Sequence, residues 1–254
     1  MNEVSNRKEV DVFIPCSVDQ FSPEIGFDLI GLVESMGFRT NYNPEQTCCG
    51  RVMFDNGNWD EAKKLGEKFI DNFNNDNYIV TCSTSCVVYL KTKCADLFLN
   101  TSYHNAYKSL AKRIMDVTEF IHTFKPNCEL GSEFNHKVYL HNNCHAQNEY
   151  NVEEETRLIL SKVKGLLLVN EKDECLNFCC GYGAGMNLYN PPVSEELARQ
   201  KIELAINLGA EYITSADNSC LLHLQNYITK HNLDIKTIHL VSLLRYSSKQ
   251  NNNE

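Results

Sequence analysis

The sequence predicts an α/β protein made of two similar halves, each with a cysteine site at the ends of its strands. First, Cys48-Cys49-Gly50 recurs as Cys179-Cys180-Gly181, with flanking cysteines at similar distances in each half. Second, short apolar strands alternate with amphipathic helices, which is the pattern of a parallel α/β sheet. Third, the cysteines of each half fall after predicted strands, and α/β sheets bind ligands beyond the carboxyl ends of their strands.

The composition is that of a globular protein with no surface for polyanions. The 254 residues are 43% hydrophobic and 22% charged, and they suffice for one large domain or two ordinary ones. A net charge of −9 and a pI near 5.4 give no support for nucleic-acid or anionic-membrane binding. The first ten residues are polar, and no apolar run approaches the ~20 residues of a membrane span. We therefore expect a cytoplasmic protein.

The first half alternates strands and helices up to residue 124. Ser22 and Pro23 predict a helix start, and Gly37 predicts the end of that helix. In chain order, the predicted elements are a strand at 10–15, a helix at 23–36, a strand at 38–42, a helix at 59–73, a strand at 78–81 and a helical stretch at 103–124.

The second half repeats this order. Its predicted elements are a strand at 136–140, a helix at 153–164, a strand at 166–169, a helix at 195–208 that Ser194 caps, and a strand at 212–215. Pro126 and Gly131 place the boundary near 127–133, which predicts domains at 1–130 and 131–246. The polar tail, 247–254, is expected to be disordered.

The spacing of the cysteines indicates an internal duplication. Cys16 and Cys144 are 128 positions apart, Cys49 and Cys180 are 131 apart, and Cys86 and Cys220 are 134 apart. Adjacent thiols aimed at one site require a turn, because neighbouring side chains of a regular strand face opposite sides. The glycine after each pair permits that turn.

The repeated cysteines predict a metal or redox site in each half. In a reducing compartment, clustered thiols bind metal or do redox chemistry more often than they form disulfides. The candidate ligands are Cys16, Cys48, Cys49 and Cys86 in the first half, with Cys82 as a fifth, and Cys144, Cys179, Cys180 and Cys220 in the second half. Cys175 lies nearby but off the repeat, and the isolated Cys94 and Cys128 are interpreted as buried thiols.

Thiolates select zinc, Cu(I) or iron–sulfur clusters. Here the cysteines come singly or in adjacent pairs, separated by some thirty residues, which resembles neither a zinc ribbon nor the compact ferredoxin motif. The spacing favours iron–sulfur over zinc and leaves both open.

Five segments carry a family resemblance that covers the chain from about Val10 to Tyr246. The segments IPCSVDQFSPEIG, QTCCG, VYLHNNCH, FCCGYGAGMN and ADNSCLLH resemble the cysteine-rich CCG-domain family, which includes the cysteine-rich component of heterodisulfide reductase and the iron–sulfur component of glycolate oxidase. They are most similar to its short stand-alone branch, the lactate utilisation A proteins. The resemblance implies one or two [4Fe–4S] clusters held by the cysteines above. It also implies a cytoplasmic three-component complex that oxidises L-lactate to pyruvate, with companion subunits that include another iron–sulfur protein.

Two features depart from the heterodisulfide reductase pattern, in which each repeat ends with two cysteines separated by two residues. Three residues separate Cys82 from Cys86, and Ala216 and Asp217 stand where the second half would need an earlier cysteine. A site of five thiols is therefore not expected in the second half, and the type and number of clusters stay open. The alternative functions are a thiol/disulfide redox subunit of the heterodisulfide reductase type and a zinc-stabilised scaffold.

The remaining candidate residues are interpreted mainly as structural. His145 matches a histidine that the resembled family often carries, where it could tune a cluster or move protons. A hydrogen-bonded loop residue is the simpler interpretation, and more so for His141. Asp217 is interpreted as a turn residue or as a group that orients Cys220. No flavin or nicotinamide motif and no residue set for a 2-hydroxy acid is visible. The sequence thus predicts two Rossmann-like halves that face each other and carry electrons as an oxidoreductase subunit that is inactive without its partners; it identifies no catalytic residue.

Overall fold

The computed structural model describes residues 8–127, 129–170 and 178–246. The chain divides into two compact units, Met1–Cys128 and Glu129–Glu254, which are described separately below. None of the helices in the described parts of the chain has the length and apolar character that spanning a bilayer requires.

The first unit contains a four-stranded parallel sheet with the order β2-β1-β3-β4. Its strands are β1 (Glu9–Phe13), β2 (Arg39–Tyr42), β3 (Tyr78–Thr81) and β4 (Ile114–Asp116). The central strands β1 and β3 are buried along almost their whole length, as expected for a parallel sheet that helices cover on both faces.

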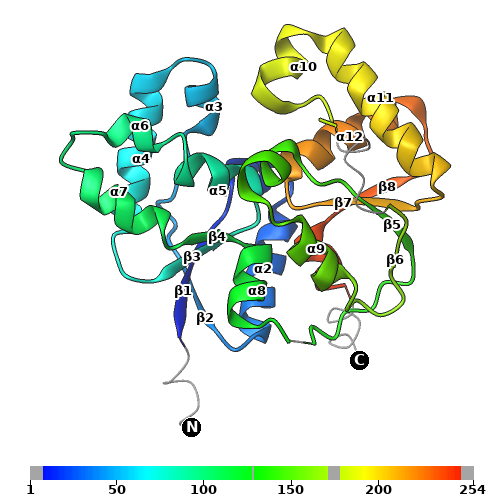
Figure 1. Cartoon of the computed structure of the whole chain (residues 1–254), viewed down its shortest axis with the longest axis horizontal. Helices are drawn as coiled ribbons and strands as arrows, with labels where there is room; N and C mark the ends of the chain where they lie inside the picture. The colour runs from blue at the N-terminus through cyan, green and yellow to red at the C-terminus, as the bar shows by residue number, and fades with distance from the viewer. Residues whose placement is uncertain (1–7, 128, 171–177, 247–254) are drawn as a thin grey trace. The chain divides into compact units, whose positions relative to one another are not determined.

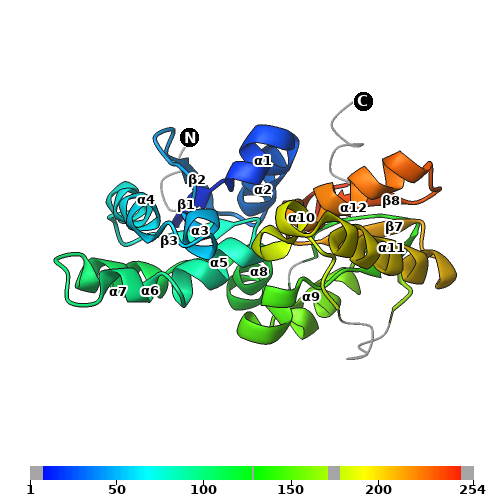
Figure 2. The same cartoon turned by 90° about the horizontal axis from the view of Figure 1, so that it is seen from above.

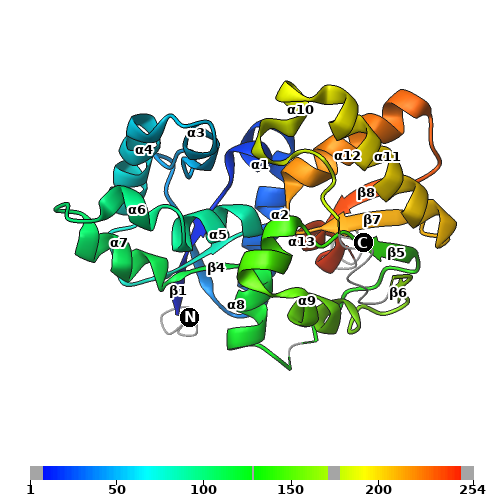
Figure 3. The same ribbon diagram turned by 45° about the horizontal axis from the view of Figure 1, so that its top comes forward.

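Eight helices surround this sheet in the described residues of the first unit. They are α1 (Cys16–Phe21), α2 (Pro23–Ser35), α3 (Arg51–Asp55), α4 (Trp59–Asn72), α5 (Thr84–Lys91), α6 (Ala95–Phe98), α7 (His104–Ala111) and α8 (Val117–Phe124). Helices α4, α6 and α7 lie on one side of the sheet, and α2 and α8 lie on the other (Figures 1 and 3). Pro23 is the first residue of α2 and Gly37 has a φ of +90°, so both predicted boundaries of this helix are confirmed.

The prediction of one helix across 103–124 is wrong, because β4 interrupts it. Ile114 and Met115 pair in parallel with Ile79 and Val80 of β3 and are buried. The apolar stripe that includes Leu110 and Val117 has helical spacing, but it spans two helices with a strand between them. Periodicity alone does not distinguish a short buried strand from a buried turn of helix.

The second unit has the same topology, with the strand order β6-β5-β7-β8 and parallel pairing throughout. Its strands are β5 (Lys137–Leu140), β6 (Leu167–Leu168), β7 (Tyr212–Ser215) and β8 (Lys236–His239). Its helices are the π-helix η2 (Ala146–Tyr150), α9 (Glu153–Leu160), the 3-10 helix η4 (Gly183–Gly185), α10 (Met186–Tyr189), α11 (Pro191–Asn207), α12 (Asn218–His231) and α13 (Leu240–Leu244). The long helices α11 and α12 run side by side and pack against each other (Figure 2). The predicted α/β fold of two similar halves is confirmed.

The predicted cap at Ser194 is wrong, because α11 begins at Pro191 with Asn190 as its N-cap. Ser194 is buried within the first turn, and its hydroxyl donates a hydrogen bond to the carbonyl oxygen of Gly181, 2.8 Å away. This serine therefore fixes the second CCG turn to α11 instead of beginning the helix.

In both units, the strand order places a crossover point between the two central strands. The chain proceeds from β1 to β2 on one side and continues through β3 and β4 on the other, and β5 to β8 repeat this path. Loops that leave neighbouring strands in opposite directions create a crevice at the carboxyl edge of the sheet, where α/β proteins bind their ligands.

Candidate metal centre

In the first unit, four thiols meet at this carboxyl edge. Cys16 begins α1 directly after β1, Cys48 and Cys49 precede α3, and Cys86 lies in the first turn of α5. The Sγ atoms of Cys16 and Cys48 are 3.7 Å apart, and those of Cys49 and Cys86 are 3.3 Å apart. Cys48 also contacts Cys49, so the four sulfurs form one continuous series. Sulfurs on one tetrahedral metal with bonds of about 2.3 Å lie about 3.8 Å apart, so each of these two pairs is spaced much as two ligands of one metal ion are.

The glycine of the CCG motif brings the adjacent thiols together. Gly50 has a φ of +95°, and its amide donates a hydrogen bond to the sulfur of Cys48, 3.4 Å away. Gly181 has the same φ of +95°, and its amide donates to the sulfur of Cys179 at 3.3 Å. The turn predicted from two adjacent thiols is present in both units, and it points a backbone donor at one sulfur of each pair.

The second unit repeats the series of thiols. Cys144 contacts Cys179, Cys179 contacts Cys180, and Cys180 contacts Cys220. Cys144 follows β5, and Cys220 lies in the first turn of α12 after β7. The structure therefore brings the eight repeat-matched cysteines into two groups of four, in the same order along each group.

Each group shares its protons unevenly, so that one member is a thiolate. Hydrogen bonds donated by Cys16, Cys49 and the Gly50 amide lower the pKa of Cys48 to about 3. The corresponding bonds from Cys144, Cys180 and Gly181 lower the pKa of Cys179. The donating thiols have a raised pKa, because ionising them would break these bonds and because they are partly or fully buried. Binding of a metal would release the protons of the thiols that coordinate it, because thiolates are the ligands.

The other cysteines differ in position. Cys82 is fully buried at the end of β3, one helical turn before Cys86, and its inclusion as a ligand stays a prediction. Cys94 is 1% exposed, and burial raises its pKa to about 12, as expected for a thiol in an apolar interior. Cys128 and Cys175 lie outside the described residues. All ten described cysteines are free thiols.

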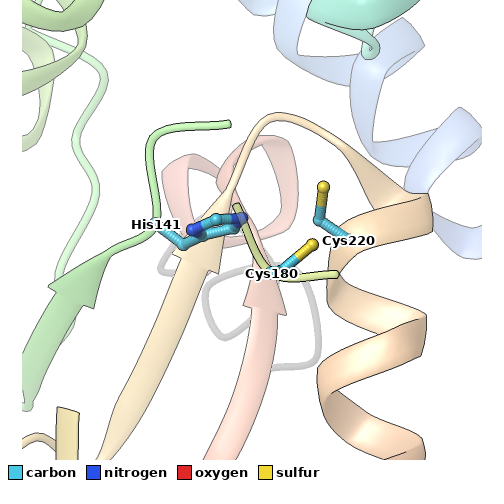
Figure 4. A group of neighbouring side chains, drawn as sticks. All are labelled: His141, Cys180 and Cys220. Atoms are coloured by element: carbon cyan, nitrogen blue, oxygen red, sulfur yellow. The ribbon is translucent and has the colours of Figure 1, made fainter. Parts of the chain in front are cut away.

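One residue interpreted as structural from the sequence lies at the second group of thiols. A ring nitrogen of His141 and the sulfurs of Cys180 and Cys220 lie within 4.8 Å of one another. Figure 4 shows the imidazole at the end of β5 with one edge directed toward both cysteines. Both ring nitrogens are buried without a hydrogen-bond partner in the described residues. Burial, with the neighbouring Lys201 charge, lowers the pKa of His141 to about 3, so the ring is neutral at pH 7.

His145 and Asp217 take part in local hydrogen bonds. The Nδ1 atom of His145 lies 2.9 Å from a carboxylate oxygen of Glu149, one turn further along the chain. Asp217 is the N-cap residue of α12 and accepts a hydrogen bond from Asn143, which directly precedes Cys144. At the equivalent position of the first unit, Ser83 caps α5 and accepts a hydrogen bond from the Cys86 amide, 3.3 Å away. Asp217 is therefore more than a turn residue, because it joins two cysteine-bearing segments.

The fold and the site define a class of protein with two α/β units, each of which has a parallel sheet and presents four thiols at the carboxyl edge of that sheet. Residues 10–91 and 138–225 match the CCG family, described as the cysteine-rich domain. The chain belongs to this family, as its repeated motif predicts.

Relatives of known name extend over nearly the whole chain. The chain is 28% identical over 245 residues to lactate utilization protein A 1 of Bacillus mycoides (strain KBAB4), covering 95% of this chain and 98% of that protein. It is 28% identical over 238 residues to lactate utilization protein A of Oceanobacillus iheyensis (strain DSM 14371), covering 93% and 96%.

A solved structure confirms the fold alone. A hypothetical protein from Helicobacter pylori superposes with a TM-score of 0.61 at 14% identity, over 94% of this chain. The present chain spans about half of that protein, since the match covers 48% of its length.

Proposed function

We propose that the chain is the iron–sulfur electron-transfer subunit of a cytoplasmic complex that oxidises L-lactate to pyruvate. The observation that carries this proposal is the pair of equivalent four-thiol groups at the carboxyl edges of the two sheets. The names of the relatives, which are lactate utilization proteins matched over nearly their full length, supply the substrate.

The donor set suits an iron–sulfur cluster in each unit. In each unit, four thiols in a continuous series supply the sulfur ligands that such clusters use, and a bound cluster accepts and releases one electron at a time. Cys16, Cys48, Cys49 and Cys86 would hold the first centre, with Cys82 as a possible fifth thiol, and Cys144, Cys179, Cys180 and Cys220 would hold the second.

Backbone groups would stabilise the negative charge of these centres. The amides of Gly50 and Gly181 already donate to one sulfur in each group. Cys86 and Cys220 lie in the first turns of α5 and α12, where the helix dipole favours negative charge. Hydrogen bonds to the sulfurs and the nearby positive helix ends contribute to the potential of a cluster, together with its ligands, its net charge and its burial.

The proposal requires partner subunits. Oxidation of lactate to pyruvate removes two electrons and two protons, whereas each centre accepts one electron and the sequence carries no flavin or nicotinamide motif. A companion subunit must therefore take the electrons from the substrate, and we propose that another iron–sulfur protein of the complex exchanges electrons with this chain.

The first experiment identifies the metal. Protein purified without oxygen is assayed for iron, acid-labile sulfide and zinc on one sample, with optical and EPR spectra. We expect brown protein with iron and sulfide. Stoichiometric zinc without sulfide after anaerobic reconstitution would instead establish the scaffold alternative.

The second experiment identifies the reaction. Lactate-dependent dye reduction is measured for the metal-loaded chain alone and for the co-expressed complex, and activity is expected only from the complex. Activity from the single chain would contradict an electron-transfer role. A fully loaded complex that is inactive toward lactate but reduces a disulfide or oxidises glycolate would move the chain to another branch of its family.

A further inference from the structure

Strand register places His141 where the first unit has a phenylalanine. In the first unit Val10 pairs with Tyr78, and in the second unit Val138 pairs with Tyr212, so β1 and β5 are equivalent strands 128 positions apart. The last residue of β1 is Phe13, and the position 128 residues later is His141. An apolar ring therefore fills this position in the first unit, so packing of the core does not require the ring nitrogens of a histidine.

The neighbour of this residue changes in the same way. The two CCG turns contact equivalent residues of α4 and α11: Gly50 lies against Ala62 and Leu65, and Gly181 lies against Ser194 and Leu197. Both pairs of contacting residues are 132 positions apart, so Phe69 of the first unit is equivalent to Lys201 of the second. Phe13 and Phe69 form an edge-to-face pair with ring centroids 4.9 Å apart. The second unit thus has an imidazole and an ammonium group in place of two buried rings.

Both polar groups are buried beside the thiols. His141 and Lys201 are each 1% exposed, and Lys201 interacts electrostatically with His141 and with Cys179, Cys180 and Cys220. A buried ring nitrogen without a hydrogen bond has lost its contact with water and gained nothing in exchange, so an unpartnered imidazole in the core is unfavourable unless a ligand uses its lone pair. One ring nitrogen of His141 lies within 4.8 Å of the sulfurs of Cys180 and Cys220, which is close enough for the three atoms to bind one metal ion.

We propose that His141 is a nitrogen ligand of the second-unit metal centre, beside Cys180 and Cys220. The first unit carries Cys82 as a fifth candidate thiol, whereas the corresponding position in the second unit, 134 residues later, is Ala216. His141 therefore supplies the fifth donor of the second unit. The centre of the first unit has sulfur ligands only, and the centre of the second unit has mixed sulfur and nitrogen ligands, with Lys201 as a buried positive charge next to them.

This difference separates the two centres electrochemically. A neutral imidazole in place of a thiolate removes one negative charge, and histidine ligation raises the potential of iron–sulfur clusters. A buried ammonium group stabilises the reduced, more negative state further. The second-unit centre is therefore the more easily reduced of the two.

The inference rests on the proposed metal centre, but its test is separate from the identity of the metal. Protein labelled with 15N-histidine is assayed for metal first. If iron is bound, pulsed EPR measures 15N hyperfine coupling; if zinc is bound, X-ray absorption measures outer-shell imidazole scattering. A histidine signal is expected with either metal, so finding zinc overturns the iron–sulfur proposal and leaves this one standing. Absence of a histidine signal in the loaded wild-type protein overturns this inference and leaves the other.

Matched variants assign the signal to one residue. His141→Phe reproduces the first-unit residue and should abolish the nitrogen signal, and it should lower the potential of one centre if iron is bound. His145→Gln, next to Cys144 but paired with Glu149, should keep the signal. A signal that survives in His141→Phe, or one that disappears in His145→Gln instead, overturns the assignment. If His141→Phe does not fold, His141→Gln, which keeps a polar side chain of similar size, takes its place in the same measurement.

Discussion

Asn143 donates a hydrogen bond to Asp217, with 2.5 Å between Nδ2 and Oδ2, and both side chains are almost completely buried. The bond joins the loop after β5 to the N-terminus of α12, and these two segments carry Cys144 and Cys220. Asn143 also accepts a hydrogen bond from the amide of Ala146, 2.8 Å away. The positions of the two outer thiols of the second group therefore depend on one buried polar contact.

Replacing Asn143 by alanine should destabilise the protein by roughly 2–3 kcal/mol, because it removes a buried donor from the carboxylate of Asp217. Urea unfolding measures the change, and metal content should fall with it. Asn135→Ala serves as the control, since its side chain is exposed and donates a hydrogen bond to Glu133 at the surface, and it should stay within about 0.5 kcal/mol of wild type. Equal stability of the two variants would show that the buried contact does not hold the loop.

The cysteines should separate into ligands and packing residues. Cys49→Ala and Cys94→Ala remove the same atoms from sites that are 3% and 1% exposed, so the cost of the cavity is similar. Only Cys49 belongs to a four-thiol group, and metal binding to thiolates is coupled to folding. We expect Cys49→Ala, and likewise Cys180→Ala, to lose metal and thermal stability, while Cys94→Ala keeps its full metal content. Metal loss in Cys94→Ala equal to that in Cys49→Ala would contradict this division.

The repeated architecture could be predicted from the sequence because the features that indicate it, the CCG turns and the cysteine spacing, are local. The CCG turns need only their own glycines, and the drift of three residues between successive cysteine pairs preserves the strand–helix order. The strand β4 was missed because Ile114 and Val117 lie on a stripe with helical spacing, and only the pairing with β3 distinguishes a strand there. Pairing is a tertiary property, and local periodicity does not report it.

His141 could not be assigned from the sequence for a similar reason. The offset of 128 residues aligns His141 with Phe13, so the sequence does show that a polar residue replaces an apolar one at this core position. The absence of a hydrogen-bond partner for its ring nitrogens among the described residues, and their distance to Cys180 and Cys220, are properties of the folded chain. The identity of the metal depends on bonds and electrons that neither spacing nor fold determines, since thiolates bind several metals.

Alanine substitutions at three glycines should destabilise the protein in a fixed order. Gly209, Gly50 and Gly181 all have positive φ, which costs an alanine about 1–2 kcal/mol. A Cβ at Gly209 meets nothing within 4 Å, a Cβ at Gly50 lies 3.2 Å from the carbonyl oxygen of Ala62, and a Cβ at Gly181 lies 2.5 Å from that of Ser194. Unfolding measurements should rank Gly209→Ala as the mildest and Gly181→Ala as the most severe, with metal lost only in the two CCG variants. A severe Gly209→Ala variant would contradict the role of close backbone packing.

Alkylation of the metal-free protein should show which thiol in each group is ionised. Hydrogen bonds from neighbouring thiols and from glycine amides lower the pKa of Cys48 to about 3 and also lower that of Cys179. Both thus remain thiolates when the pH falls from 8 to 6, whereas an ordinary thiol loses most of its thiolate over that range. Both are also partly exposed, unlike Cys49 and Cys180. Peptide mapping after brief iodoacetamide treatment should therefore find Cys48 and Cys179 modified at rates that change little between pH 8 and pH 6. Buried Cys94, whose pKa is raised to about 12, should stay unmodified throughout. A steep fall in labelling of Cys48 and Cys179 at pH 6 would show that the hydrogen bonds within each group do not hold a thiolate.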